Sequence, residues 1–242
     1  MNKDLSAVAV IPARGGSKRI PRKNLYPING RPMLAWVIET AIAAEVFDDI
    51  VVSSEDDEIL ETAVSCGVRA HKRPLHLADD RTHVGPVVED YLNSLSSQPD
   101  SVCLLYATAL LLKPEQLKQA CALLKNDTVS SVLAIAEFES PIQRAYELGE
   151  DGSIRMADPT FFNWRSQDLP PRYRDAGCFS WWKLHRTREQ RGVGLVVPRQ
   201  SAVDIDSPDD LFIASALHRA TRFSDHQLDV NSECSKNSGY RS

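Results

Sequence analysis

The chain has 242 residues, of which 28 are Lys or Arg and 33 are Asp or Glu, so its net charge is −5. Hydrophobic residues make up 43% and charged residues 25%, proportions typical of one sizeable globular domain. The acidic balance argues against a nucleic-acid partner. No apolar run reaches the roughly 18 residues that span a bilayer, and residues 1–6 lack the apolar stretch of a signal peptide. We therefore expect a cytoplasmic protein without a membrane partner.

Strands and helices alternate along the first half of the sequence. The apolar run Ala7–Pro12 predicts a buried strand. Further strands are predicted over residues 50–53, 102–106 and 129–136, and helices over 32–46, 56–66, 84–95 and 114–125. This alternation is typical of parallel βαβ units. We therefore predict an α/β fold with a doubly wound, mostly parallel sheet.

The alternation ends after Phe138. Residues 140–182 are rich in aromatic residues, prolines and charges without clear periodicity, which predicts an insertion with irregular strands. Strands over 195–197 and 203–205 resume the sheet, and Ser207-Pro208 predicts the start of a helix to about Ala220. Residues 1–220 therefore form one predicted domain. The polar segment 221–242 is predicted to be a disordered tail.

A Gly-Gly turn follows the first strand within residues 11–24, IPARGGSKRIPRKN. No acidic residue occurs between Arg14 and Arg31, whereas six cations do. In an acidic chain this local excess predicts an anionic ligand, with glycine N–H groups and cationic side chains on phosphate oxygens. The patterns GxxxxGK[ST] and GxGxxG are absent, which argues against a P-loop kinase or an NAD enzyme. A solvated basic loop or a nucleic-acid patch is the alternative.

The same segment resembles the opening signature of the sugar-acid cytidylyltransferases, the CMP-sialic acid synthetase family. The resemblance extends to about Ala220. Its other landmarks are Arg73-Pro74 followed by Leu77-Ala78-Asp79-Asp80, Tyr106-Ala107-Thr108-Ala109, and Asp204-Ile205-Asp206. Within the family, Tyr-Ala-Thr-Ala and the run from Arg165 to Pro170 followed by Asp175-Ala176-Gly177 are similar to the pseudaminic acid cytidylyltransferases.

Some positions depart from that subfamily. Arg174 stands where a His usually precedes Asp-Ala-Gly, and Leu110 stands where a Pro usually follows Tyr-Ala-Thr-Ala. A usual Gln-Phe-Tyr-Trp is replaced by Cys178-Phe179-Ser180-Trp181, and a usual Thr-Gly-Thr by Thr82-His83-Val84. The resemblance therefore implies CTP-dependent activation of a nine-carbon sugar acid, with pseudaminic acid favoured. N-acylneuraminate, legionaminate or KDO cytidylyltransferases, and a catalytically weakened nucleotide-binding homologue, stay open as alternatives.

The resemblance also implies roles for individual residues. Arg14, Lys23 and Asp206 are the implied catalytic residues, with Lys23 at the α-phosphate of CTP. The implied nucleotide-binding residues are Ala13, Arg14, Gly15, Gly16, Ser17, Lys18, Lys23, Asn24, Arg73, Thr82 and His83. The implied sugar-binding residues are Tyr106, Thr108, Arg165, Gln167, Arg172 and Asp175.

Asp204 and Asp206 are the predicted ligands of a Mg²⁺ cofactor. Two residues apart on a strand end, their side chains would share one face. Mg²⁺ takes one or two carboxylates together with phosphate oxygens and water. For an isolated Asp-x-Asp, a simple turn before the Ser207 cap would be the better interpretation, but the phosphate loop favours the metal.

Residues 140–182 also predict the assembly. Aromatic residues and arginines of the kind enriched at interfaces fill this segment, and the resemblance implies a dimerisation element that reaches the partner's sugar pocket. We expect a homodimer in which Arg165 or Arg172 holds the sugar carboxylate in the partner's site, since the planar fork of Arg suits a carboxylate. A self-contained flap with exposed arginines is the alternative.

Overall fold

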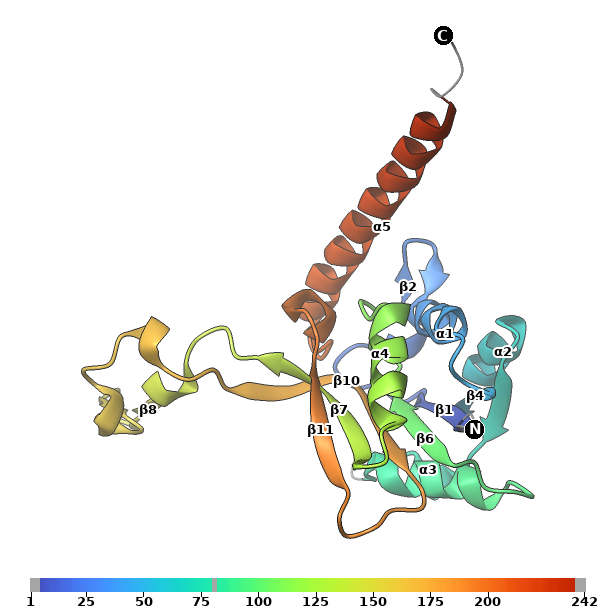
Figure 1. The fold of residues 1–242 in the computed structure, drawn as a ribbon, viewed down its shortest axis with the longest axis horizontal. Coiled ribbons are helices and arrows are strands. Elements are labelled where there is room, and N and C mark those ends of the chain that lie inside the picture. The colour runs from blue at the N-terminus through green and yellow to red at the C-terminus, as the bar shows by residue number, and fades with distance from the viewer. Residues whose placement is uncertain (1–4, 80–81, 238–242) are drawn as a thin grey trace.

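A seven-stranded mixed sheet forms the centre of the computed structural model, in the order β11-β7-β10-β6-β1-β4-β5 (Figure 1). The structure describes residues 5–79 and 82–237, with side chains as far as Arg222. The strands are β1 (Ala7–Pro12), β4 (Asp49–Ser54), β5 (Arg69–Lys72), β6 (Ser101–Leu105), β7 (Val129–Glu137), β10 (Tyr173–Lys183) and β11 (Arg191–Val196). All neighbouring pairs are parallel except those that β10 makes with β6 and β7. The predicted α/β, mostly parallel sheet is confirmed.

Helices cover both faces of this sheet. They are α1 (Met33–Ala43), α2 (Asp57–Ser65), α3 (Val84–Asn93) and α4 (Pro114–Leu124). Alternate β1 residues point to opposite faces: Ala7 and Ile11 join a core cluster with α1, α2 and α4, whereas Val8 and Val10 join a second cluster with α3. Burial on both faces explains the continuous apolar run of β1.

Local signals explain how several of these helices begin and end. Asp56 caps α2 by accepting the Ile59 N–H at 3.2 Å, and Gly67 beyond its end has φ +80°, a conformation that glycine adopts without strain. At α5 (Pro208–Asn237), the Ser207 hydroxyl oxygen accepts the Asp210 N–H at 3.2 Å, and Asp210 accepts the Ser207 N–H at 2.8 Å. The predicted cap at Ser207 is thus confirmed as a reciprocal box.

The segment 140–182 differs from the prediction. Residues 173–182 are not part of an insertion, because they belong to β10, which lies between β6 and β7 inside the sheet. Its alternating burial gives the reason: Ala176, Cys178, Phe179 and Trp181 are buried in the core. The excursion is therefore residues 138–172, which leave the sheet after β7 and return as β10.

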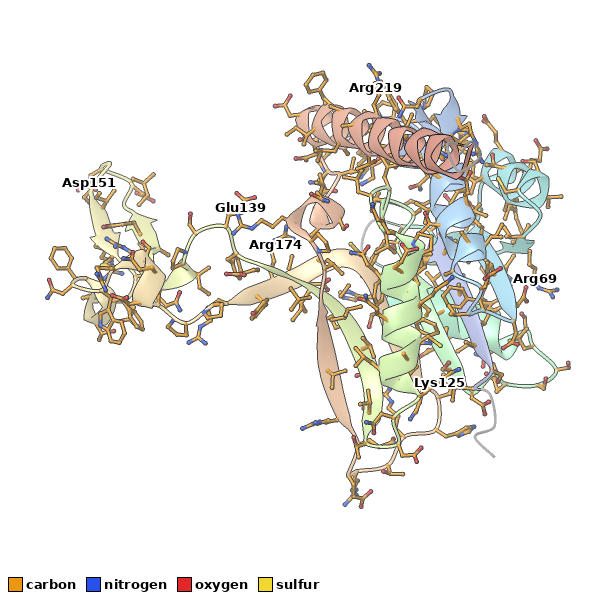
Figure 2. All side chains as sticks on the ribbon, turned by 45° about the horizontal axis from the view of Figure 1, so that its top comes forward. Arg69, Lys125, Glu139, Asp151, Arg174 and Arg219 are labelled. Atoms are coloured by element: carbon orange, nitrogen blue, oxygen red, sulfur yellow. The ribbon has the colours of Figure 1, made fainter. Side chains whose placement is uncertain are left out.

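The excursion projects from the end of β7 and the start of β10 as a thin arm (Figures 1 and 2). Its base is closed by the Phe138 N–H, which donates to Arg172 O at 3.0 Å, and its outer part carries the hairpin of β8 (Tyr146–Leu148) and β9 (Ile154–Met156). In Figure 2, Asp151 lies at the far end of the arm, whereas Glu139 and Arg174 lie near the sheet. No other described part of the chain packs over the β8–β9 hairpin in these views.

Two further predictions about elements are wrong. Residues 203–205 form no strand; they follow a short 3-10 helix, Arg199–Ala202, and Val203 and Ile205 pack instead with Ile20, Ile28 and Met33 below the loop after β1. The last helix, α5, continues to Asn237 rather than ending near Ala220. No Gly or Pro occurs between Thr221 and Asn237 to stop it. Residues 238–242 of the predicted tail, and Asp80 of the family motif, lie outside the described residues.

Two small features complete the fold. The hairpin of β2 (Pro27–Ile28) and β3 (Arg31–Pro32) turns at Asn29 and Gly30, both at positive φ, as a tight two-residue turn requires. Over the described ranges, 5–79 and 82–237, no helix combines the length and hydropathy needed to cross a bilayer.

Candidate active site

A pocket of about 560 Å³ opens at the carboxyl ends of the parallel strands, where open α/β sheets bind their ligands. It collects residues that follow β1, β5 and β6, together with Asp206 from the segment before α5. Its lining comprises Pro12, Arg14, Ser17, Lys18, Arg19, Lys23, Asn24, Arg73, Leu77, Asp79, Thr82, Val84, Val87, Tyr106, Ala107, Thr108 and Asp206. Most of the predicted nucleotide residues and two of the predicted sugar residues are therefore brought together.

The loop between β1 and the 3-10 turn Lys23–Leu25 is fixed at both ends. The Ala13 N–H donates to Ser53 O at 3.0 Å, which prolongs the pairing of β1 with β4. The buried Asn24 amide donates to Arg14 O at 2.9 Å. Ala13 itself is buried in the core and does not line the pocket. Asn24 therefore holds the shape of the loop by this contact.

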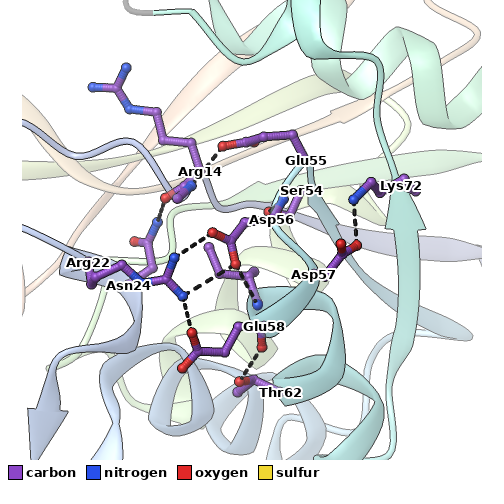
Figure 3. Close-up of polar contacts among 12 residues, drawn as sticks. Arg14, Arg22, Asn24, Ser54, Glu55, Asp56, Asp57, Glu58, Thr62 and Lys72 are labelled. Carbon is purple, nitrogen blue, oxygen red and sulfur yellow. Dashed lines mark hydrogen bonds and ion pairs between the residues drawn. The ribbon is translucent and has the colours of Figure 1, made fainter.

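An acidic turn after β4 supports the loop from below (Figure 3). The Gly15 N–H, predicted to approach a phosphate, donates here to Glu55 Oε1 at 2.8 Å. Arg22, at φ 56°, donates through Nη1 to Asp56 Oδ2 at 2.6 Å and also pairs with Glu58. Desolvation acts to raise the pKa of Asp56, but the Ile59 N–H and the Arg22 guanidinium outweigh it and hold that pKa below its usual value.

Gly15 has a steric reason as well. A Cβ at this position would lie 2.3 Å from Asp56 Oδ2, so any side chain would push the loop off the turn. Gly16, in contrast, has no atom within 4 Å of the corresponding position. Gly15 thus serves close packing against the turn, whereas Gly16 lies at an open part of the loop.

Lys23 and Asp206 form an ion pair at one wall of the pocket. The Lys23 ammonium donates to Ile205 O at 2.6 Å and lies 3.3 Å from Asp206 Oδ1, while Arg19 Nη2 lies 2.9 Å from Asp206 Oδ2. The Asp206 N–H donates to Asp210 Oδ2 at 3.2 Å, so the α5 cap also positions the metal candidate. The predicted catalytic pair therefore lies within contact distance.

Asp204 lies beside this pair without lining the pocket. Partial desolvation and the negative charge of Asp206 raise the pKa of Asp204, and Lys23 opposes the shift. Desolvation and the carboxylates of Asp175 and Asp204 likewise raise the pKa of Tyr106, which does line the pocket. Asp175 accepts the Gly177 N–H at 2.8 Å within β10 and does not line the pocket, although its charge acts on Tyr106.

The donor chemistry of Asp204 and Asp206 fits a hard divalent cation. Such an ion needs only one or two carboxylates when phosphates and water complete its ligands, and these two carboxylates are separated by one residue in the segment before α5. Among the described residues, no group of three or more His, Cys, Asp or Glu side chains forms a cation site. A metal here would therefore depend on the ligand's phosphates.

On the opposite side of the pocket, Arg73 and Thr82 occupy the predicted nucleotide side. Arg73 is buried and paired with Glu55, and Thr82 Oγ1 donates to His76 O at 3.3 Å. His83 precedes α3 next to Thr82 but does not line the pocket.

The arm residues lie elsewhere. Gln167 and Arg172 line a separate groove at the root of the excursion, and Arg165, on the arm, makes a bidentate pair with Asp168 at 2.7 and 3.0 Å. None of the three lines the nucleotide pocket of its own chain. Arg174, where a His was usual, donates to Ala202 O at 2.8 Å and ties β10 to the segment before Asp204.

Sequence reasoning missed Glu55, Asp56, Arg19 and Asp79 as site residues. Arg19 was counted among the loop cations, but its pairing with Asp206 joins residues far apart in sequence. Glu55 and Asp56 follow a predicted strand whose carboxyl end lies at the site edge. That position was the available signal, because residues following such ends gather at the ligand.

Comparison with known proteins agrees with this geometry. A model of the family described as Cytidylyltransferase matches residues 8–149. A pseudaminic acid cytidylyltransferase of Campylobacter jejuni is 40% identical over 222 residues, 88% of this chain and 96% of that protein. An N-acylneuraminate cytidylyltransferase A of Danio rerio is 31% identical over 145 residues, 60% of this chain and 34% of that protein.

The fold has solved relatives too. A CMP:2-keto-3-deoxy-manno-octonic acid synthetase complexed with CTP superposes with a TM-score of 0.64 at 16% identity, covering 89% of this chain and 99% of that one, a likeness that concerns the fold. The resemblance seen in the phosphate loop and in the Asp-x-Asp segment is thus confirmed over most of the sequence. This chain belongs to the cytidylyltransferase family of nucleotidyltransferases.

Proposed function

We propose that the protein transfers the cytidylyl group of CTP to a nonulosonic acid of the pseudaminic type and releases pyrophosphate. The observation that carries the proposal is the pocket itself, whose lining combines the loop cations Arg14, Lys18 and Lys23 with Asp206. The 40% identity with a pseudaminic acid cytidylyltransferase over nearly the whole chain supports the choice of sugar.

The reaction joins the sugar's C2 oxygen to the α-phosphorus. The C2 hydroxyl attacks in line and gives up its proton to solvent. The bond between the α-phosphorus and the oxygen bridging to the β-phosphorus breaks, and that oxygen leaves with the pyrophosphate. Such a step depends on positioning and charge neutralisation rather than on a covalent intermediate. Arg14, Ser17 and Lys18, which line the pocket, would hold the triphosphate, and Lys23 would neutralise charge that develops at the α-phosphate.

The negative residues supply the other half of the charge balance. Asp206, supported by Asp204, would hold Mg²⁺ with the phosphate oxygens, and the ion would offset their charge. Arg19 and Lys23 pair with Asp206 in this structure. Both cations would therefore lie close to phosphate oxygens that share a metal ion with this carboxylate. Tyr106 and Thr108 line the adjoining wall, where the sugar would bind.

We also propose that the protein is a homodimer built through the arm. The arm exposes apolar side chains that a monomer leaves in water: Ile142, Tyr146, Leu148, Ile154, Phe162 and Trp164 are each at least 43% exposed. Clustered exposed apolar residues mark interaction surfaces. A second copy would also bring the arm residues Arg165, Gln167 or Arg172 to a nucleotide pocket, since they do not line the pocket of their own chain.

A coupled pyrophosphate assay tests the reaction. The purified chain, CTP and Mg²⁺ are combined with pseudaminic acid and, separately, with N-acetylneuraminic, legionaminic and 2-keto-3-deoxy-octonic acids. We expect pyrophosphate release with CTP and the highest kcat/KM with pseudaminic acid. A higher kcat/KM with another sugar would reassign the substrate, and no release with any of them would exclude the activity.

A further inference from the structure

Glu55 connects two parts of the nucleotide pocket that are distant in sequence. Its side chain is only 13% exposed. One carboxylate oxygen, Oε1, accepts the Gly15 N–H of the phosphate loop at 2.8 Å. The other, Oε2, accepts from Arg73 Nη2 at 2.7 Å and Nε at 3.2 Å. A single carboxylate thus contacts the loop after β1 and the arginine after β5.

A carboxylate is an unexpected neighbour for a triphosphate, because like charges repel. Its contacts explain its presence. The Arg73 side chain is 4% exposed, and a charge so buried needs an opposite charge. Both oxygens of an ionised carboxylate accept hydrogen bonds, whereas the amide of glutamine has one acceptor oxygen and one donor NH2 group. A glutamine at position 55 could therefore not accept from both Gly15 and Arg73 in the same way.

The backbone around Glu55 strengthens this connection. The Ala13 N–H donates to Ser53 O and the Arg73 N–H to Ser54 O, each at 3.0 Å. Gly15 packs so closely on Asp56 that a Cβ would not fit. The turn after β4 therefore holds the starts of both pocket segments; Figure 3 shows its contacts with the loop after β1.

We infer that Glu55 is a positioning residue, which fixes the phosphate loop and the Arg73 guanidinium relative to each other so that one nucleotide contacts both. The inference rests on the proposed CTP-dependent function. It assigns Glu55 no contact with the substrate: Glu55 acts through Gly15 and Arg73. Loss of the second acceptor oxygen of Glu55 would weaken the binding of ligands at either end of the pocket.

Calorimetric binding to three ligands tests this. Inorganic tripolyphosphate reports the phosphate loop, CMP reports mainly the cytidine side, and CTP reports both together. The variants are Glu55→Gln, Arg73→Lys, and Asp57→Asn as matched control. Asp57 lies in the same turn and pairs with Lys72 on the exposed side, so its substitution removes the same charge without touching either pocket segment.

We expect Glu55→Gln to weaken CTP binding at least about tenfold, the equivalent of one lost charged hydrogen bond. The binding of tripolyphosphate and of CMP should weaken as well. Arg73→Lys should raise the dissociation constant of CMP and leave that of tripolyphosphate within about twofold. Asp57→Asn should leave the dissociation constants of all three ligands within about twofold. In turnover, the KM for CTP should rise in Glu55→Gln while the KM for the sugar acid stays within about twofold, a split that general loosening of the fold would not produce.

Two results would overturn the inference: CTP binding by folded Glu55→Gln within about twofold of the unsubstituted chain, or an equal rise in both KM values. If Glu55→Gln does not fold, the double variant Glu55→Gln/Arg73→Met removes the unpaired charge of Arg73 and replaces it in the test. Unchanged tripolyphosphate binding by this double variant would overturn the inference, and weakened binding would support it. Absence of CTP binding by the unsubstituted chain would overturn the proposed function and this inference together.

Discussion

Lys23 combines a charge with a fixed direction. Its ammonium is held by Ile205 O and Asp206 at one wall of the pocket. A cation fixed before the reaction stabilises charge as it develops, without reorganisation. Lys23→Ala should therefore lower kcat by about 100-fold or more while weakening CTP binding much less. Stopped-assay kinetics and CTP calorimetry measure the two effects, with the exposed Lys118→Ala as control. Unchanged kcat would remove Lys23 from the mechanism.

Asp206 differs from Lys23 in the ligand it would hold. The α5 cap positions its backbone, and its side chain is 37% exposed at the pocket, so substitution should leave the fold intact. Asp206→Asn should lower activity at 1 mM Mg²⁺ by about 100-fold, in the range for lost charge stabilisation of a phosphoryl transition state, and a Mg²⁺ titration follows the loss. Asp209→Asn, with the same charge change in the first turn of α5, is the control. Full activity of Asp206→Asn at low Mg²⁺ would contradict the metal assignment.

At the residue scale, a contiguous stretch of sequence was enough to predict which loop residues lie together at the pocket. Arg14, Lys23 and Asn24 belong to one motif, and each lines the pocket. The partner of Gly15 could not be read in the same way, because nothing in a single sequence pairs position 15 with Glu55. Contacts between segments that follow different strands appear only once the strand order is known.

At the scale of elements, periodicity predicted what is regular. The buried strand β1 and helices α2, α3 and α4 lie where their apolar spacing placed them. β10 was hidden because its sequence, YRDAGCFSWWK, begins polar and follows the arm without a break. Its place between β6 and β7 is decided by strand pairing over long sequence distances. The expected strand at 203–205 failed for the opposite reason: its apolar residues serve a local core below the loop.

The central position of β10 makes a prediction about stability. Trp181 is fully buried, stacks on Phe47 with ring centroids 4.9 Å apart, and donates to Ser101 Oγ at 3.2 Å. Trp181→Ala should lower the free energy of unfolding by about 3–5 kcal/mol, as measured by urea denaturation. Phe212→Ala, which removes a ring that is 76% exposed on α5, should change it by less than about 0.5 kcal/mol. Equal effects would contradict the assignment of Trp181 to the core.

At the scale of the whole molecule, the arm separates residues implied in sugar binding from the pocket of their own chain. Arg165 is 71% exposed and already paired with Asp168, whereas Arg172 lies with Gln167 in the groove at the arm's root. The two arginines are thus unequal candidates for the sugar carboxylate. The Asp168 pair occupies the fork of Arg165, which favours Arg172.

A shared site would make activity depend on subunit exchange. Each site would combine Asp206 of one chain with the arm arginine of the other. Chains carrying Asp206→Asn and chains carrying Arg172→Ala should each be inactive as homodimers, but a mixed dimer contains one site with both native residues. Mixing them should therefore restore activity up to about one quarter of the unsubstituted level, since half of the dimers are mixed and each has one of two sites intact. Light scattering tests whether the protein is a dimer, and mass spectrometry tests whether the subunits have exchanged. A monomer at micromolar concentration, or verified exchange without recovery of activity, would rule out a shared site through Arg172. Recovery of activity when Arg165→Ala replaces Arg172→Ala in the mixture would assign the role to Arg165.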